Sequence, residues 1–209
     1  MLRYHKFVVN VVQENAYLLW DETNLACLID PGFSNISEQQ SLIDFLEKHE
    51  LQLAKCLCTH LHFDHVWGAK FISEHYGIDV EASKEEIEVM PDLDSQLKSF
   101  GLPADVGTNS FKPLSPPKVI SFGNTELEVI STPGHSPGHI CLYNHQSKVL
   151  FCGDVLFKSG YGRYDLWGGD YESLMASIQR LFTLPDDTIV LSGHGDITTI
   201  GAERNHFNQ

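Results

Sequence analysis

The sequence is poor in basic residues. Its 209 residues include 14 lysines and arginines against 28 aspartates and glutamates, which gives a formal net charge of -14. A protein that holds nucleic acid needs a surface rich in lysine and arginine to neutralise the phosphates. The charge therefore argues against a nucleic-acid partner. It does not argue against metal ions, because carboxylates are among their usual ligands.

The sequence also lacks an apolar run of the roughly 20 residues that a membrane-spanning helix needs. Near the N-terminus, residues 7–12 (FVVNVV) follow Arg3 and Lys6. This run is too short for the apolar region of a secretion signal, contains Asn10 and has no obvious small-residue cleavage site after it. We interpret residues 7–12 as the first strand, and we predict a cytoplasmic protein that does not contact a membrane.

Cysteine is scarce, and its number is odd. All five cysteines lie in apolar, strand-like runs, which indicates buried, reduced thiols rather than a framework of disulfides. Cys56 and Cys58 alternate with Leu57, which is typical of two residues on one face of a strand, and we prefer this interpretation to a pair of metal ligands. The five residues are Cys27, Cys56, Cys58, Cys141 and Cys152.

No low-complexity tract or short-period repeat interrupts the sequence, and its two halves show a similar order of patterns. Strand-like apolar runs alternate with segments of helical spacing, such as Leu42, Ile43 and Leu46. This order predicts one α+β domain over residues 1–209, with two sheets sandwiched between helices. The further predicted strands cover 17–20, 26–30, 53–59, 118–121, 125–131, 140–143, 148–152 and 188–192, and the predicted helices cover 37–49, 65–76 and 173–182.

Local signals also place two helix ends and one irregular segment. Ser37 can cap the helix over 37–49, and Gly77 can end the helix over 65–76. Residues 91–117 are rich in glycine, proline and asparagine, which predicts a loop with one short helix near 94–100. This segment is either a lid or pocket wall, or a plain surface insertion.

Histidine and aspartate gather where predicted strands end. Residues 59–65 (THLHFDH) place three histidines and one aspartate at the end of the strand over 53–59. The stretches 132–139 (TPGHSPGH), 152–155 (CGDV) and 192–195 (SGHG) stand at the ends of three other strands, with glycine beside the polar residue so that the backbone can turn sharply. One such residue is ordinary in a turn. Four strand ends of this kind in one chain predict a metal site.

In order and approximate spacing, these four stretches resemble the metallo-β-lactamase superfamily along nearly the whole chain. Within it, LFKSGYGRYD at 156–165 and GDITTIGAER at 195–204 resemble the glyoxalase II, or hydroxyacylglutathione hydrolase, branch. The resemblance implies a four-layer αββα sandwich. The chain ends 15 residues after His194, so we expect a short, single-domain form without the helical C-terminal domain of full-length glyoxalase II.

The resemblance further implies two divalent metal ions, with zinc preferred and iron or manganese as alternatives. The ligands offer nitrogen and oxygen without thiolate, which suits these metals. His60 and His62 lie two residues apart and can point the same way, whereas Asp64 and His65 can serve a neighbouring ion. His139 lies in a ligand loop, and we expect it to contact and orient a metal ligand without binding the metal itself. By resemblance, the first ion is bound by His60, His62 and His135, the second by Asp64, His65 and His194, and Asp154 bridges both.

Such a centre predicts a metal-dependent hydrolase. Two divalent ions lower the pKa of a shared water towards about 7, and the metal-bound hydroxide attacks a carbonyl whose oxyanion a metal stabilises. A thiol of pKa about 8.5 departs as thiolate with little help, and no separate general acid is evident. The site therefore suits small thioesters such as S-lactoylglutathione. Asp64 can also orient the hydroxide besides acting as a ligand.

Other activities on the same fold are alternatives. A mononuclear iron persulfide (sulfur) dioxygenase shares the GRxD run found at 162–165, and a lactonase can use a similar metal site. A non-enzymatic scaffold is disfavoured because the ligand set is complete. The acidic charge disfavours a nuclease, and the lack of a secretion signal disfavours a β-lactamase.

Two basic residues are candidates for substrate binding. Arg163 stands where the resemblance places a contact to glutathione, and Lys158 is the next candidate. The equally weighted alternative is that Arg163 forms an ion pair with Asp165 or Asp170.

Overall fold

The computed structural model describes residues 1–104, 110–114 and 119–207. Within these residues the first half of the chain forms a six-stranded sheet whose strands lie side by side in chain order. The first three strands are antiparallel, and the third to the sixth are parallel. The strands are β1 (Arg3–Val9), β2 (Glu14–Trp20), β3 (Leu25–Ile29), β4 (Gln52–Leu57), β5 (Val80–Ala82) and β6 (Phe111–Pro113).

The described residues of the second half form another six-stranded sheet, in the order β14-β13-β10-β9-β8-β7. The neighbouring strands β10 and β13 are parallel, so their carboxyl ends lie at the same edge. The strands are β7 (Val119–Phe122), β8 (Thr125–Ser131), β9 (Ile140–Asn144), β10 (Val149–Gly153), β13 (Ile189–Ser192) and β14 (Thr198–Thr199), and a small hairpin adds β11 (Leu156–Phe157) and β12 (Gly160–Tyr161).

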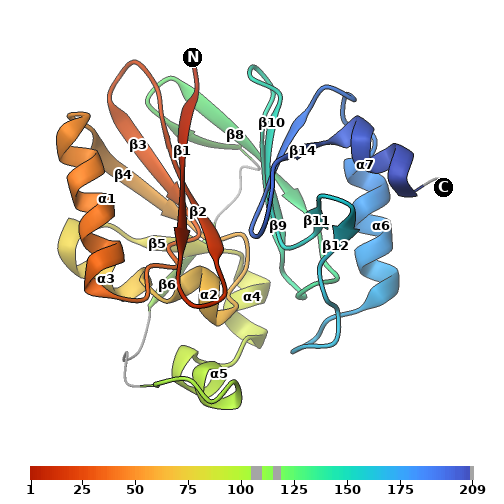
Figure 1. Cartoon of the computed structure of the whole chain (residues 1–209), viewed down its shortest axis with the longest axis horizontal. Helices are drawn as coiled ribbons and strands as arrows, with labels where there is room; N and C mark the ends of the chain where they lie inside the picture. The colour runs from red at the N-terminus through yellow and green to blue at the C-terminus, as the bar shows by residue number, and fades with distance from the viewer. Residues whose placement is uncertain (105–109, 115–118, 208–209) are drawn as a thin grey trace.

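Helices cover the outer faces of the two sheets (Figure 1). Helices α1 (Ile36–Lys48) and α3 (Ala69–Tyr76) lie on the first sheet, and α6 (Tyr171–Leu181) and α7 (Ile200–Phe207) lie on the second. Alternation along β2 shows how the layers join: Leu18 packs towards the helices, whereas Tyr17 and Leu19 pack towards the second sheet. A third apolar cluster joins the second sheet to α6 and α7. The predicted four-layer αββα sandwich is confirmed.

Most predicted elements are present within a residue or two of their expected ends, but the first strand, predicted over residues 7–12, spans Arg3–Val9, and residues 10–13 form a turn. All five cysteines are free and buried, as predicted. Among the described residues, no helix is long and apolar enough to cross a membrane. The expected cap of α1 is wrong, because the helix begins one residue earlier and the side chain of Asn35, not Ser37, accepts a hydrogen bond from the Glu38 amide at 3.1 Å.

The single helix predicted over 65–76 is also wrong in part. The structure has two helices, α2 (Phe63–Val66) and α3, which are separated at Gly68. The amide of Gly68 donates to the carbonyl of Pro31 at 2.8 Å. A Cβ at this position would lie 2.8 Å from the same oxygen. The close approach of the loop after β3 therefore requires glycine here and ends the first helix. Gly77 ends α3 with φ +66°, as predicted.

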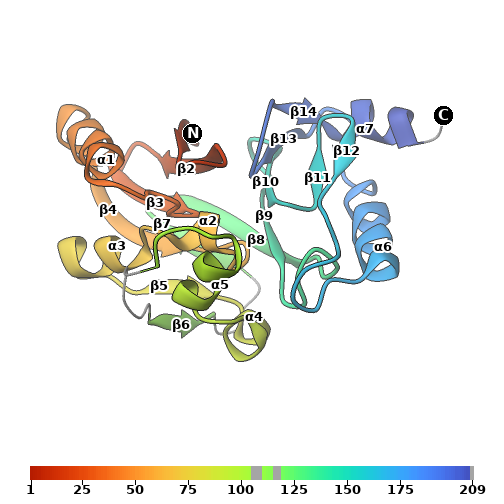
Figure 2. The same ribbon diagram turned by 60° about the horizontal axis from the view of Figure 1, so that its bottom comes forward.

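The segment 91–117 is less irregular than predicted. It holds the expected short helix, α5 (Leu93–Ser99), but also strand β6, which the sequence did not reveal. Helix α4 (Lys84–Val89) precedes it. Figure 2 shows α5 beside α2, where the rings of Phe63 and Phe100 lie 4.9 Å apart. Residues 105–109 and 115–117 of this segment lie outside the described residues.

Candidate metal centre

The predicted ligands converge because the loops that carry them meet at one edge of the sandwich. The loop after β4 and helix α2 carry the 59–65 stretch, the loop between β8 and β9 carries 132–139, and the loops after β10 and β13 carry the other two. Glycines make the last two turns possible. Gly153 has φ +45°, Gly195 has φ +75°, and a Cβ on Gly153 would lie 2.4 Å from Thr59 Oγ1.

Three buried imidazoles form the first cluster. His135 Nε2 lies 2.7 Å from His62 Nδ1 and 3.2 Å from His60 Nε2. Burial, together with the neighbouring histidines, lowers the pKa of His60 well below its usual value and that of His62 to about 3. The pKa of His135 is lowered too, chiefly by burial. Neutral imidazoles at this spacing direct lone pairs at one another, which a cation between them would stabilise.

The second cluster combines a carboxylate with two imidazoles. Asp64 Oδ2 lies 3.1 Å from His194 Nε2 and 3.7 Å from His65 Nε2. Burial would lower the pKa of His65, but the charges of Asp154, Asp64 and Asp30 outweigh burial and raise it well above its usual value. This part of the site therefore has a strongly negative potential, which favours a cation.

Asp154 lies between the two clusters. Its Oδ2 is 3.7 Å from His135 Nε2 and 3.6 Å from His194 Nε2, and its Oδ1 is 3.4 Å from His65 Nε2. Burial would raise the pKa of Asp154, but the charge of His65, whose Nε2 lies 3.4 Å away, holds it well below the usual range. The residue is therefore an ionised carboxylate within reach of both clusters, as a bridging ligand must be.

The seven residues fit a pair of divalent ions. Among the described residues, His65 Nε2 and Asp154 Oδ1, which face each other at 3.4 Å, are buried polar atoms without a hydrogen-bond partner. Buried polar atoms are rarely left unpaired in folded proteins, and these two atoms belong to predicted ligands. Triads from both clusters have ligand atoms within 4.8 Å of one another. The donor set is nitrogen and oxygen, which suits zinc, iron or manganese.

Partners outside the clusters fix which ring nitrogen faces inward. His65 Nδ1 donates to Asp30 Oδ2 at 3.0 Å, and His135 Nδ1 donates to the Arg163 carbonyl at 2.7 Å. His60 Nδ1 contacts Thr59 Oγ1 at 3.0 Å. In each ring the remaining Nε2 faces the other ligands, so the orientations are set without an ion.

Sequence reasoning missed Asp30, which it treated only as the last residue of the strand predicted over 26–30. Asp30 is buried and accepts hydrogen bonds from the Thr59 amide and hydroxyl, both at 2.7 Å, as well as from His65. It therefore positions both sides of the 59–65 stretch. A signal was present, because Asp30 is an acidic residue at a strand end, like the residues that were chosen.

Glu86 in α4 was missed as well. Its carboxylate is buried and accepts from the Leu61 amide at 3.0 Å, the Gly138 amide at 2.8 Å and the Ser136 hydroxyl at 2.5 Å. Burial raises its pKa, while these hydrogen bonds oppose the shift. Glu86 thus ties together the two loops that hold the first cluster. It stands in the charged run KEEIE, where no local signal distinguishes it from surface residues.

His139 lies where the sequence predicts, behind a ligand. Its Nε2 accepts from the Asp154 amide at 3.2 Å, and its Nδ1 lies 3.0 Å from Thr132 Oγ1. Burial keeps its pKa well below the usual value. A neutral His139 therefore holds the backbone of the residue between the clusters.

Comparison with known proteins agrees with this geometry. The family model described as Metallo-beta-lactamase superfamily matches residues 9–194. The chain belongs to this superfamily. It is 39% identical over 202 residues to a hydroxyacylglutathione hydrolase, GloC, of Haemophilus influenzae. The aligned residues cover 94% of this chain and 92% of that protein. It is 34% identical to a probable metallo-hydrolase, YqgX, of Bacillus subtilis, over 97% of this chain and 95% of that one.

Solved structures of the superfamily show the same fold. The B3 metallo-beta-lactamase BLEG-1 superimposes with a TM-score of 0.87 at 34% identity, covering 98% of this chain and 97% of that one. TTHA1623, solved in a di-iron-bound form, superimposes with a TM-score of 0.85 at 33% identity, over 97% and 98% of the two chains. The resemblance predicted from the motifs is therefore confirmed.

The two predicted substrate-binding cations are placed differently in this member of the superfamily. The Arg163 side chain lines the pocket at the clusters but forms an ion pair with Asp165, with Nε 2.8 Å from Oδ1. Lys158 pairs with Asp196 at 3.0 Å and is not among the lining residues. Asp170 instead caps α6. The alternative pairing with Asp165 is thus present, and the contact of either cation with substrate stays a prediction.

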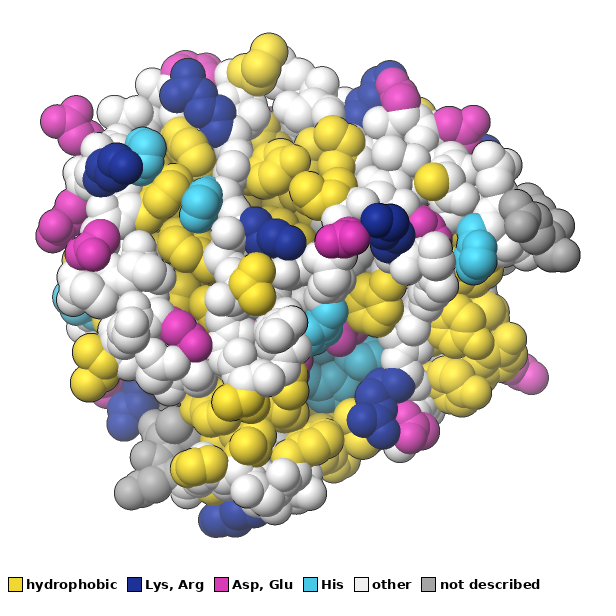
Figure 3. Space-filling model, viewed as in Figure 1, with side chains coloured by type: hydrophobic (Ala, Val, Ile, Leu, Met, Phe, Trp, Pro, Cys, Tyr) yellow, Lys and Arg dark blue, Asp and Glu magenta, His cyan; other side chains and the backbone are white. Residues whose placement is uncertain are grey.

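The pocket at the clusters has a volume of about 190 Å³. Figure 3 shows histidine and acidic side chains at the bottom of a hollow with hydrophobic side chains around it. Besides Arg163, the lining consists of ligand candidates and apolar side chains. These are His62, Asp64, His135, Asp154 and His194 on one side, and Val12, Phe63, Phe100, Leu166 and Trp167 on the other.

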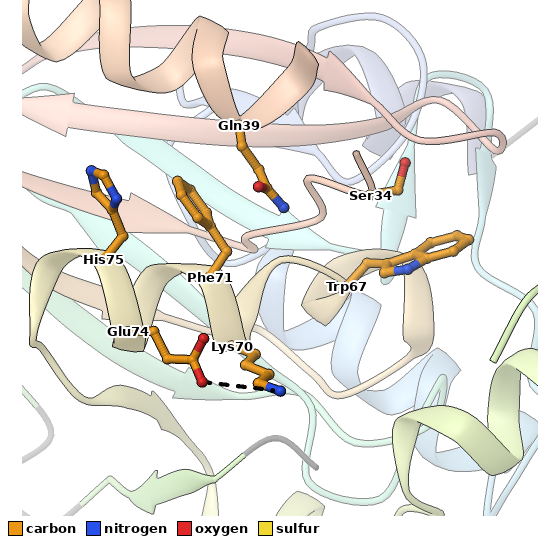
Figure 4. Close-up of a pocket in the computed structure, with 7 residues that line it drawn as sticks. All are labelled: Ser34, Gln39, Trp67, Lys70, Phe71, Glu74 and His75. Atoms are coloured by element: carbon orange, nitrogen blue, oxygen red, sulfur yellow. Dashed lines mark ion pairs between the residues drawn. The ribbon is translucent and has the colours of Figure 1, made fainter. Parts of the chain in front are cut away.

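A larger hollow of about 490 Å³ lies elsewhere, between α1 and the α2–α3 segment (Figure 4). Gln39 points into it from α1, and Trp67 and Phe71 form its opposite wall. Its lysine, Lys70, pairs with Glu74. A single histidine lines it, so it lacks the converging ligands of the smaller pocket. The chemistry, not the size, identifies the site.

Proposed function

We propose that this metal-dependent hydrolase of the metallo-β-lactamase superfamily acts on small thioesters, with S-lactoylglutathione as the first candidate, and uses two metal ions. The position of Asp154 between the two clusters carries the proposal, because a carboxylate within reach of both is what a dinuclear centre needs. The identity to a hydroxyacylglutathione hydrolase supports the substrate class. Zinc is the preferred metal, and the di-iron-bound relative supports iron as the alternative.

The seven ligand candidates would be shared between the two metal ions. His60, His62 and His135 would hold one ion, Asp64, His65 and His194 the other, and Asp154 both. When bound, two such ions would lower the pKa of a water and polarise the thioester carbonyl.

The apolar lining of the pocket and the carboxylate of Asp64 have separate roles in the proposed reaction. The apolar side chains of the pocket limit access of bulk water, which strengthens charge interactions inside. Asp64 lies beside His194 at the open side, where it can accept a hydrogen bond from the attacking water and orient it. A thiol of pKa about 8.5 leaves as thiolate, so the chain needs no further acid.

Metal content and a substrate panel test this proposal together. Elemental analysis of reconstituted protein should give two ions per chain, and release of thiol from S-lactoylglutathione should depend on them. A lactone panel and oxygen uptake with a persulfide on iron-loaded protein test the two alternative activities. One ion per chain at full activity would overturn the dinuclear mechanism, and oxygen uptake without thioester hydrolysis would replace the proposed reaction.

A further inference from the structure

We propose that the site selects thioesters with an apolar, preferably aromatic, acyl group, which packs against the rings of Phe100 and Trp167. This inference rests on the proposed function and names its substrate class. We call Phe63, Phe100 and Trp167 the aromatic wall.

The aromatic wall forms a continuous surface from a predicted ligand to solvent. The ring of Trp167 lies 5.6 Å from that of His62, Phe100 lies 6.0 Å from Trp167, and Phe63 lies 4.9 Å from Phe100. The three residues come from different segments: α2, the end of α5 and the loop between β12 and α6. Rings spaced 4.5–7 Å apart favour offset or edge contacts, so a further flat group can join the row.

Apolar side chains remain exposed at the open side of this pocket. Phe100 is 42% exposed and Val12, which also lines the pocket, is 43% exposed. Apolar surface that gathers around polar site residues marks a place where a ligand removes it from water. The acyl group is the part of the substrate that must lie here, because its carbonyl has to reach the ligand clusters.

The size of the pocket fits an aromatic acyl group. Its volume is about 190 Å³, and a cavity of about 150 Å³ is enough to hold benzene. A phenyl ring with a short linker to the carbonyl therefore fits. A tripeptide thiol such as glutathione is much larger, so most of it must extend out of the pocket.

The polar lining offers little to the carboxylates of glutathione. Of the described residues that line the pocket, Arg163 is the one lysine or arginine. Its Nε and Nη2 donate to the two oxygens of Asp165 at 2.8 and 2.9 Å, so two of the five guanidinium N–H donors already have a carboxylate partner. Recognition of the acyl group by the aromatic wall is therefore the stronger source of selectivity.

The test compares acyl groups on one thiol with the metal-loaded protein. We expect kcat/KM for S-phenylacetylglutathione to exceed that for S-acetylglutathione by at least about tenfold, the range that apolar pockets give for small additions. The same phenylacetyl group on uncharged N-acetylcysteamine should react about as well. Equal values for acetyl and phenylacetyl would overturn the inference.

Substitutions in the aromatic wall test whether it causes the preference for the phenylacetyl substrate. Trp167→Ala and Phe100→Ala should each lower kcat/KM for the phenylacetyl substrate about tenfold more than kcat/KM for the acetyl substrate, and an unchanged circular dichroism spectrum and metal content show that the variants fold. The matched control is Tyr164→Ala, because Tyr164 lies in the loop of Trp167, is as exposed as Phe100 and is not among the lining residues. If Trp167→Ala behaves like Tyr164→Ala, the aromatic wall does not bind the acyl group.

A binding measurement separates this inference from the proposed reaction. By calorimetry, phenylacetate should bind the metal-loaded wild type at least about tenfold more tightly than acetate, and Trp167→Ala should remove the difference. If no thioester is hydrolysed but phenylacetate is preferred, the proposed reaction fails and the apolar subsite stands. If thioesters are hydrolysed and the two acids bind alike, the subsite fails alone.

Discussion

The two ligand clusters differ in burial and in how the chain holds them. The His135 side chain is 2% exposed, whereas that of His194 is 27% exposed. Glu86 ties the loops of the first cluster to α4 through one buried carboxylate. The loop of His194 is held through its backbone, where Asn15 donates to the Gly195 carbonyl at 3.1 Å.

This difference indicates a division of labour within one centre. A buried and braced cluster keeps its geometry with or without an ion, because its rings are fixed from outside. In the second cluster His65 is equally buried and is held by Asp30, whereas His194 lies at the open side, where it leaves room for substrate and for exchange of the ion. We therefore expect the first cluster to hold its ion more tightly than the second, and four substitutions can break or sharpen this comparison.

Asp154→Ala should have the largest effect, because the Asp154 carboxylate lies within 3.7 Å of ligand candidates from both clusters. Both ions should bind more weakly, by more than the 10–100-fold typical of outer partners, and thioester hydrolysis should fall with them. Metal titration against a competing chelator measures both sites. Normal affinity at either site would show that Asp154 does not bridge.

His194→Ala should come next, and it should separate the clusters. We expect the second site to be emptied, again with a loss beyond about 100-fold in affinity, while the first keeps its ion, because His194 does not belong to the first cluster. Elemental analysis should give about one ion per chain in place of two. Equal losses at both sites would contradict the assignment.

Glu86→Gln should weaken the first cluster without touching a ligand. The amide keeps the shape of the side chain but turns one acceptor into a donor, so it cannot satisfy all three of its present partners. We expect about a 10–100-fold loss of affinity at the first site, and a smaller loss at the second, by chelator competition. Glu85→Gln, an exposed neighbour on the same helix, is the control. Equal metal affinities of the two variants at the first site would show that Glu86 does not brace the first cluster.

Arg163→Ala should have the smallest effect. His135 is held by the main-chain carbonyl of Arg163, which the substitution keeps, so the metal content should not change. Exposed ion pairs contribute little, and we expect KM for S-lactoylglutathione and for an uncharged thioester to change alike, by less than about threefold. A selective rise of several-fold to a hundredfold for the glutathione substrate would show that Arg163 binds its carboxylate.

The sequence by itself determined the order of the layers and the residues that converge. Period-two and helical spacing report which face of each element is buried, so β2, α1 and α6 were predictable from local pattern. The seven predicted ligands stand at strand ends, and strand ends in layered folds meet at one edge. Their residue types were therefore enough to predict the cluster, as the distances around Asp154 show.

Only the tertiary structure decided how the centre is braced and lined. Glu86 contacts Gly138 across 52 positions and Phe100 meets Trp167 across the pocket. Such pairs leave no periodic trace, because each partner looks like an ordinary surface residue in its own segment. The break at Gly68 has the same origin, since a glycine is tolerated within a helix until another segment, here Pro31, approaches its backbone. Residue type and position at strand ends therefore identified the predicted ligands, whereas contacts between distant segments determine which residues hold and line the centre.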